Sequence, residues 1–128
     1  AAGRRRCLGG PRPGAPERMM AERESGPGLV WCPFPDAEIA QAVAATMLDE
    51  GLAACANILG SIHSLFVWNG ERGEAEETGV LFKTDAALFD RAIARLAELH
   101  PYDAPAILAW RCDAAFSATA AWLAELRG

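Results

Sequence analysis

The sequence predicts an α+β domain from about residue 28 to the C-terminus. Its predicted core is a four-stranded antiparallel sheet with two helices on one face, followed by an extra C-terminal helix. Strand-like and helix-like patterns alternate in the order β-α-β-β-α-β before the last helical segment. Apolar residues make up 52% of the 128 residues, which favours a packed core over global disorder. An Asn69-Gly70 pair between two strand-like segments predicts a hairpin.

The first strand is predicted at residues 29–32, a short apolar run closed by Pro33. Asp36 then serves as the N-cap of a helix over residues 37–50, in which apolar side chains recur every four positions. Gly51 is well placed to end this helix, because glycine readily adopts the left-handed conformation of the C′ residue.

A long β segment follows over residues 54–68, with a bend or bulge expected at Gly60-Ser61. Its return strand is predicted over residues 72–84. The Asn69-Gly70 turn connects the two, because both positions tolerate a positive φ. The hairpin is expected to project a polar end into solvent and to pack its other end into the core.

Thr84 or Asp85 is expected to cap a second helix that ends at His100-Pro101, since a residue before proline is pushed out of helical space. A fourth strand is predicted over residues 106–111. The final amphipathic helix is predicted from its apolar stripe, which consists of Phe116, Ala120, Leu123 and Leu126.

This order of elements corresponds to the split β-α-β, ferredoxin-like arrangement. Two helices cover one face of such a sheet, and the last helix is too small to cover the other. Phe66, Trp68 and Trp110 are large apolar groups expected on long or exposed strands. Exposed apolar area of this kind marks an interface, so the sequence predicts association of the chain.

Charge divides the chain into two parts. Residues 1–27 hold six arginines and three glutamates, a charge of about +3, which leaves about −8 for the remainder of a chain whose formal net charge is −5. We interpret residues 1–27 as a disordered basic tail, with Met19 or Met20 as a candidate true start and residues 1–18 outside the native chain. An acidic domain predicts no nucleic-acid partner, and the absence of long apolar runs predicts no membrane partner.

The four cysteines have no CxxC spacing and the tail has no apolar signal region. Free thiols in a cytoplasmic, reducing compartment are therefore expected. No nucleophilic triad, P-loop or other catalytic motif is present, which predicts a protein that is not an enzyme. An enzymatic alternative rests on residues at a subunit cleft, such as Tyr102 with Lys83. The acidic residues Glu74, Glu76 and Glu77 are interpreted as a solvated strand near the hairpin tip.

Cys32, Cys55 and His100 are candidate metal ligands, because thiolate and imidazole groups suit copper and zinc. They lie at two strand ends and at a helix end, and the crossovers of the predicted fold can bring such groups together. The alternative is structural. Each cysteine is then a small buried hydrophobe, and His100 is a helix C-cap that interacts with the helix dipole.

Five segments in register carry a family resemblance. They read GLAACANI (residues 51–58), SLFVWNGE (64–71), LFKT (81–84), LHPYDAP (99–105) and WL (122–123). Together they resemble the motifs of the CutA family of divalent-cation tolerance proteins over residues 29–126. The resemblance implies a ferredoxin-like protomer in a tight trimer with hairpins exchanged between neighbours. It also implies a non-enzymatic role in tolerance of copper and other divalent ions.

Within the resemblance, Cys32, Cys55 and His100 stand at positions that match family cysteines or the motif histidine. Two departures weaken a metal site, because Leu99 replaces a second histidine and Ala106 replaces a glutamate. Lys83, the only lysine beside eleven arginines, is either selected for its compact ammonium or a chance survivor. We therefore expect a weakly bound copper or other divalent ion.

Two other classes of function compete with this one. A PII-like regulatory trimer would bind a small anionic metabolite or a protein partner in its clefts. An RNA-recognition module on the same topology would need a basic sheet with stacking aromatics, against which the charge of the domain argues.

Overall fold

The computed structural model describes residues 24–128, so the predicted basic tail lies almost entirely outside the described residues. The four strands are β1 (Pro27–Phe34), β2 (Cys55–Trp68), β3 (Glu71–Asp85) and β4 (Leu108–Arg111). They form one sheet in the order β2-β3-β1-β4, and every neighbouring pair is antiparallel. The helices are α2 (Ala37–Asp49), α3 (Phe89–Leu99) and α4 (Ser117–Ala124), with short 3-10 turns η1 (Ala86–Leu88) and η2 (Glu125–Arg127). The predicted sheet-and-helix composition is confirmed.

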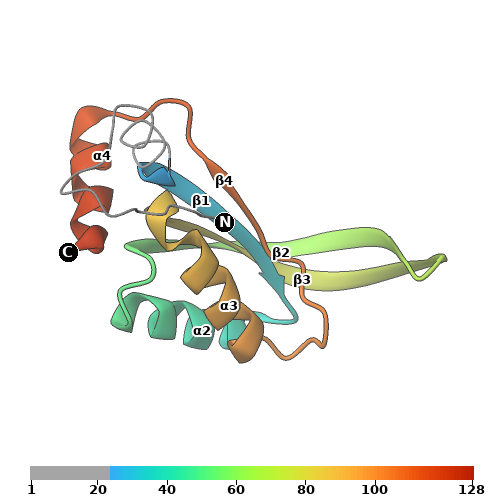
Figure 1. Ribbon diagram of the computed structural model, residues 1–128. Helices are drawn as coiled ribbons and strands as arrows, with labels where there is room; N and C mark the ends of the chain where they lie inside the picture. The colour runs from blue at the N-terminus through green and yellow to red at the C-terminus, as the bar shows by residue number, and fades with distance from the viewer. Residues whose placement is uncertain (1–23) are drawn as a thin grey trace, which may run out of the picture.

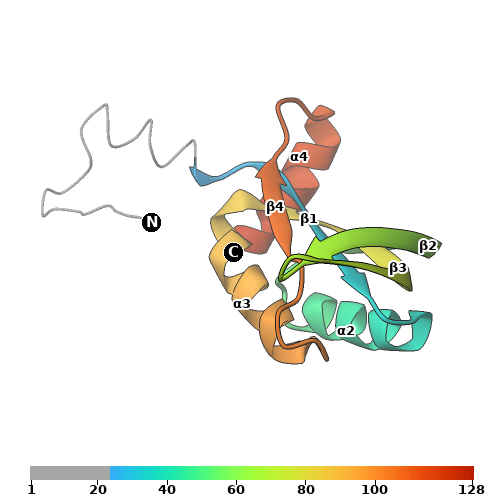
Figure 2. The ribbon, with the colours of Figure 1, turned by 90° about the vertical axis from the view of Figure 1, so that its right-hand side faces the viewer.

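Helices α2 and α3 lie together on one side of the sheet, and α4 lies near the start of β1 (Figures 1 and 2). Every second residue of β1 is buried beneath α2 and α3, as the pleat of a strand requires. The core consists mainly of Val30, Cys32, Phe34, Ala40, Val43, Ala44, Met47, Val80, Phe82, Ala92 and Leu96. None of the described helices combines the length and the apolar character needed to cross a membrane.

Strand β1 is longer than predicted, because it continues through Pro33 to Phe34. The carbonyls of Pro27 and Pro33 point away from β3, since that of Pro27 accepts from Cys112 and that of Pro33 accepts from His100. The nitrogen of Pro33 points the same way, towards an edge that β4 no longer occupies, because β4 pairs β1 only as far as Trp31. The missing N–H of Pro33 therefore removes no ladder hydrogen bond, and the proline is tolerated inside the strand.

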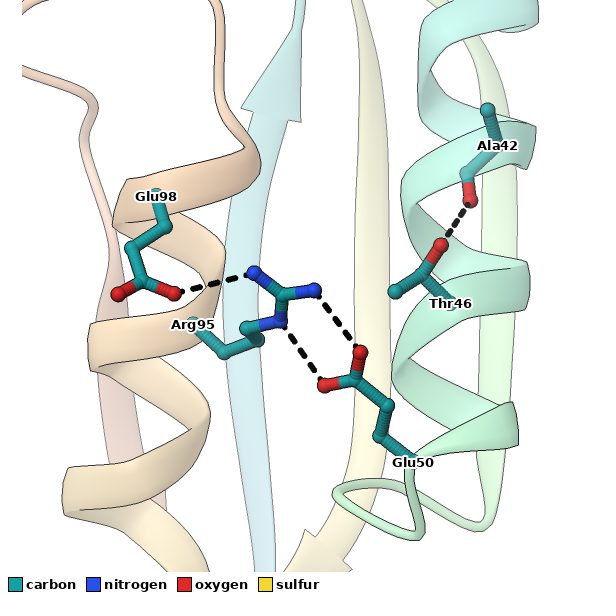
Figure 3. Close-up of polar contacts among 5 residues, drawn as sticks. All are labelled: Ala42, Thr46, Glu50, Arg95 and Glu98. Atoms are coloured by element: carbon teal, nitrogen blue, oxygen red, sulfur yellow. Dashed lines mark hydrogen bonds and ion pairs between the residues drawn. The ribbon is translucent and has the colours of Figure 1, made fainter.

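The predicted ends of α2 are confirmed. The Asp36 carboxylate accepts the N–H of Ile39 at 2.8 Å, and Gly51 has a φ of +70° directly after the C-cap Glu50. A bidentate ion pair links this end to α3, because the guanidinium of Arg95 donates to both carboxylate oxygens of Glu50 at 2.9 Å and also to Glu98 (Figure 3).

The second helix begins differently from its prediction. Asp85 is the cap, but it caps the 3-10 turn η1 before α3 starts at Phe89. Its side chain is fully buried, and its carboxylate accepts the N–H groups of Gly26 and Ala87. Arg127 adds an ion pair at 3.4 Å, so one carboxylate joins the start of β1, the end of β3 and the C-terminal turn.

The hairpin of β2 and β3 extends well beyond the helix-covered part of the sheet (Figure 1). We call residues 61–68 and 71–78 the arm. Asn69 and Gly70 have φ values of 54° and 79°, which confirms the predicted turn. The register shifts between Ile58 and Ser61, which confirms the predicted bulge.

The C-terminal region departs most from its prediction. Strand β4 begins at Leu108 rather than at residue 106, and its four residues all pair with β1. In the final helix Leu123 is buried, but Phe116 is 76% exposed. The predicted apolar stripe is therefore wrong at Phe116, which precedes α4 and points its apolar surface into solvent.

Candidate functional site

His100 lies at the sheet edge that β4 leaves free, directly after α3, and is only 6% exposed. Its Nε2–H donates to the carbonyl oxygen of Pro33 at 2.7 Å, and its Nδ1 accepts the backbone N–H of Tyr102 at 3.2 Å. These two partners require the neutral Nε2–H tautomer. Both ring nitrogens are therefore engaged within the protein.

Aromatic and hydrogen-bond contacts hold the His100 ring in place. The ring stacks on Phe34 with centroids 4.6 Å apart and planes 15° apart, and it meets the Tyr102 ring at 4.7 Å. The hydroxyl of Tyr102 donates to Glu77 at 2.9 Å. Burial and this hydrogen bond raise the pKa of Tyr102 to about 12. The group thus fastens the segment after α3 to β1 and to the base of the arm.

Cys32 lies near His100, because its Sγ lies 3.8 Å from the same Pro33 carbonyl oxygen. The thiol is fully buried. Burial, and secondarily the charge of Glu77, raise its pKa to about 12. The thiol is therefore protonated at neutral pH, whereas a metal ligand must be a thiolate.

Cys55 is not brought to this place. It pairs with Lys83 across β2 and β3, whereas Cys32 pairs with Val80 across β1 and β3. Residues paired across two strands point to the same face of a sheet, and successive residues of one strand point to opposite faces. Lys83 and Val80 are three residues apart on β3, so their partners Cys55 and Cys32 lie on opposite faces of the sheet. The side chain of Cys55 instead lies 3.7 Å from the amide oxygen of Asn57.

The three predicted ligands do not form a ready-made metal centre in one protomer. Among residues 24–128, no group of three or more His, Cys, Asp or Glu side chains is placed to hold an ion. Cys32 and His100 meet at Pro33, but the thiol would have to lose its proton and the imidazole one of its hydrogen bonds. Coordination by these residues stays a prediction.

The sheet face opposite α2 and α3, which we call the open face, is a second candidate site. Cross-strand register places on it Leu29, Trp31, Cys55, Phe66, Trp68, Leu81, Lys83, Leu108 and Trp110. Trp68, Leu108, Trp110 and Phe66 are 61%, 62%, 46% and 45% exposed. The predicted exposure of Phe66, Trp68 and Trp110 is confirmed, and it extends over both the arm and β4.

Two glycines shape this face. A Cβ at Gly79 would lie 2.3 Å from the Trp31 ring, and one at Gly73 would lie 2.4 Å from the Phe66 ring. Each aromatic ring therefore packs directly against the backbone of β3 at a glycine, where there is no side chain in the way. Gly73 and Gly79 therefore leave room for two aromatic rings on the open face.

The sequence interpretation missed one polar group on the arm. His63 contacts Glu74 and Glu76 through its two ring nitrogens, and Ser61 donates to Glu76. The signal was available, because a two-residue turn at Asn69-Gly70 pairs residue 68 with 71 and therefore residue 63 with 76.

Comparison with known proteins gives one consistent family. The family model for "CutA1 divalent ion tolerance protein" matches residues 28–126. The chain is 39% identical over 97 residues to the "Divalent-cation tolerance protein CutA" of Pyrococcus horikoshii, covering 76% of this chain and 94% of that protein.

Solved structures agree with the sequence comparison. The "divalent ion tolerance protein CutA1" of Ehrlichia chaffeensis is similar with a TM-score of 0.75 and 29% identity, covering 81% of this chain and 97% of that one. A protein from Archaeoglobus fulgidus, described as a "Periplasmic divalent cation tolerance protein CutA", has a TM-score of 0.74 and 28% identity, covering 78% and 97% of the two chains.

Proposed function

Because the chain belongs to the CutA1 family of divalent ion tolerance proteins, we propose that it acts as a non-enzymatic homotrimer in the response to divalent cations, copper among them. Its family is named for tolerance of ions rather than for a reaction. The protomer is a ferredoxin-like unit in this proposal, since a β-α-β-β-α-β order with two helices on one face is that arrangement.

The open face is the observation that carries the trimer. Leu108 and Trp110 on β4 and Trp68 on β2, the two edge strands of the sheet, remain about half or more exposed beside residues 24–128. Burying such area gains about 25 cal/mol for each Å² removed from water. Strand β2 is also an edge strand whose outer backbone groups lack a partner in the described sheet, and a neighbouring chain would satisfy them.

Light scattering on a dilute sample tests the trimer. A mass of three chains is expected at all practical concentrations, because several aromatic residues are buried together on association. Trp110→Ser should lower the mass, whereas Phe116→Ser serves as a matched control, since Phe116 is equally apolar but lies outside the open face. A stable monomer of the parent chain would refute the proposal.

For the ion, we propose that copper binds through His100 and Cys32, with Cys55 the least well placed of the three predicted ligands. Soft thiolate and imidazole groups favour copper over magnesium or calcium. To bind the ion, His100 must give up its hydrogen bond to the Pro33 carbonyl and Cys32 must lose its proton. Both steps cost free energy, so we expect weak binding that releases a proton. Binding should therefore weaken as pH falls, because protons compete with the metal ion for its ligands.

Calorimetric titration with copper tests this site. His100→Ala and Cys32→Ala should each reduce the heat, and Cys112→Ala is the matched control because Cys112 is another free thiol outside the predicted set. If both ligand variants bind copper as the parent does, the site is wrong. The family membership and the fold would not be affected by that result.

One observation favours a second function, a PII-like regulatory trimer that binds a small anionic metabolite. The Lys83 ammonium lies on the open face beside Cys55 and Leu29, and it makes no hydrogen bond or ion pair within the described part of the chain. A cation in half-buried apolar surroundings is a candidate anion contact. Thermal-shift measurements with nucleotides should show stabilisation that Lys83→Gln removes, and no shift with any nucleotide would eliminate this function.

A cytoplasmic location is part of the main proposal. Cys32, Cys55 and Cys112 are all free thiols, as expected in a reducing compartment. Cell fractionation tests this, and recovery in an oxidising compartment would contradict it.

A further inference from the structure

The polar group on the arm forms a chain of contacts across the two strands. Ser61 Oγ donates to Glu76 Oε1 at 2.9 Å, His63 Nδ1 lies 2.5 Å from Glu76 Oε2, and His63 Nε2 lies 3.3 Å from Glu74 Oε2. Residues 61, 63 and 65 pair with 78, 76 and 74, so these side chains share the face of the arm away from the open face. We call them the clasp.

The geometry of the clasp selects one protonation state. Each ring nitrogen of His63 faces a carboxylate oxygen, and a carboxylate can only accept hydrogen bonds. The imidazolium has an N–H at both nitrogens and satisfies both glutamates. A neutral ring has one N–H, which leaves a nitrogen lone pair facing the oxygen of Glu74 or Glu76.

We propose that the clasp is a pH-responsive brace of the arm, which holds β2 and β3 together when His63 is an imidazolium and loosens when the ring loses a proton. Its influence on assembly rests on the proposed function, because the arm carries Phe66 and Trp68, two of the exposed residues of the open face.

The electrostatic surroundings agree with this geometry. Glu76 and then Glu74 raise the pKa of His63, while His63 and then Ser61 lower the pKa of Glu76. The next charged residue on the same face is Arg72, which pairs with Val67 nearer the turn. No helix contributes a charge that acts on the His63 ring within residues 24–128.

The sign of the pH dependence follows. The pKa of His63 is higher in the folded chain than in the unfolded chain, where it is about 6.5. The clasp therefore stabilises the arm fully below about pH 6.5, and this stabilisation disappears as pH rises through the folded pKa of His63. At the acid end it persists until Glu76 is protonated, below the usual range of a glutamate. The arm is therefore braced most firmly in mild acid and least firmly in alkaline solution.

This brace acts where the protomer supplies little else. The arm lies beyond the core, and its apolar side chains Leu65, Phe66 and Val67 are 58%, 45% and 65% exposed. Local opening is easiest where a segment has few buried contacts. A cross-strand ion pair there changes the opening equilibrium of the arm without changing that of the core.

NMR of the intact chain tests the proposal directly, because the sequence has only two histidines and His63→Gln assigns their signals. His63 is expected to titrate above about 6.5, with both ring nitrogens protonated in mild acid. Arm amide protection, corrected for intrinsic exchange, should fall about two- to fivefold as pH rises from mild acid through the His63 midpoint, the range expected for an exposed ion pair.

The variants separate the clasp from general charge effects. His63→Gln keeps a hydrogen-bonding side chain but should abolish the pH dependence of arm protection, whereas Arg72→Gln, the matched control on the same face, should retain it. A His63 midpoint at or below the ordinary value, or unchanged pH dependence in His63→Gln, would overturn the proposal. Light scattering separates the clasp from the proposed trimer. A monomer at every pH would refute the trimer, whereas the titration of His63 would still decide whether the clasp responds to pH.

Discussion

The body of the domain, by which we mean everything outside the arm, shares strands β2 and β3 with the arm, but the two regions are stabilised in different ways. In the body, β3 buries Val80 and Phe82 beneath α2 and α3, with exposures of 0% and 1%. In the arm, the continuation of β2 leaves Leu65 and Val67 more than half exposed. The body therefore has a hydrophobic core within one chain, whereas the arm depends on strand pairing, its turn and the clasp.

This difference shows that secondary structure and burial are separate properties of a hairpin. Strand β3 is continuous from Glu71 to Asp85, and its backbone pairing does not stop where the core stops. Beyond that point Phe66 and Trp68 lie on the open face, where contact with another chain is proposed above. Substitutions in the two regions should therefore differ in both size and concentration dependence.

The largest effect is expected from Leu96→Ala in the body. Leu96 is fully buried, so truncation should lower the free energy of unfolding by about 2–5 kcal/mol. Urea denaturation measures this. Leu65→Ala removes the same atoms from the arm and should cost much less in a dilute sample. Equal losses for both variants would show that the arm has a core of its own.

The turn of the arm should be the next most sensitive place. Replacing Asn69 and Gly70 together by valine forces two β-branched residues into positive φ, at a cost of roughly 1–2 kcal/mol per position. The expected result is a lower assembled mass by light scattering, with little change in the far-ultraviolet signal of the helices. Gly60→Ala is the matched control, because a Cβ at Gly60 meets nothing within 4 Å.

A smaller loss is expected when the buried carboxylate that closes the edge of the body is removed. Asp85→Ala leaves the N–H groups of Gly26 and Ala87 without their acceptor, which should cost about 1–2 kcal/mol. Asp36→Ala, which removes an exposed cap with one accepted N–H, should cost less. The reverse order in thermal unfolding would contradict the assigned role of Asp85.

The smallest effect is expected from Arg95→Ala on the surface of the body. The Arg95 hydrogen bond lowers the pKa of Glu50 in the folded chain from its ordinary value of about 4.5. The ion pair therefore contributes stability above about pH 4.5, and this stability is lost as pH falls through the folded pKa of Glu50. The melting temperature should fall only slightly at pH 7, and the difference should vanish in high salt. A large, salt-independent drop would be inconsistent with an exposed pair.

Local sequence signals predicted the elements whose causes are local. Asp36, Gly51 and the Asn69-Gly70 turn act within a few residues of themselves, and all three were placed correctly. Pro33 was misjudged because its cost depends on which strand edge its nitrogen faces, which only the pairing of β1 with β4 decides.

The candidate site was harder to predict than the fold. His100 finds its acceptor 67 residues away, at Pro33, and no spacing pattern indicates such a contact. Cys32 and Cys55 look alike in the sequence, and only the register of β3 places them on opposite faces. By contrast, the pairing of His63 with Glu76 follows from the turn and could have been found by counting back from Asn69.

The bulge between Ile58 and Ser61 has a consequence for how the chain tolerates changes of length. Towards the body, the core sets the register, with Ile58 opposite Val80; towards the tip, the turn sets it, with Trp68 opposite Glu71. The two registers differ by one residue, and the extra residue of the bulge absorbs the difference. A one-residue deletion at Leu59 or Gly60 would therefore leave the pairings on both sides intact. The same deletion elsewhere in the hairpin would shift the pairing of β2 with β3 by one residue. Length variation among relatives should therefore concentrate at the bulge.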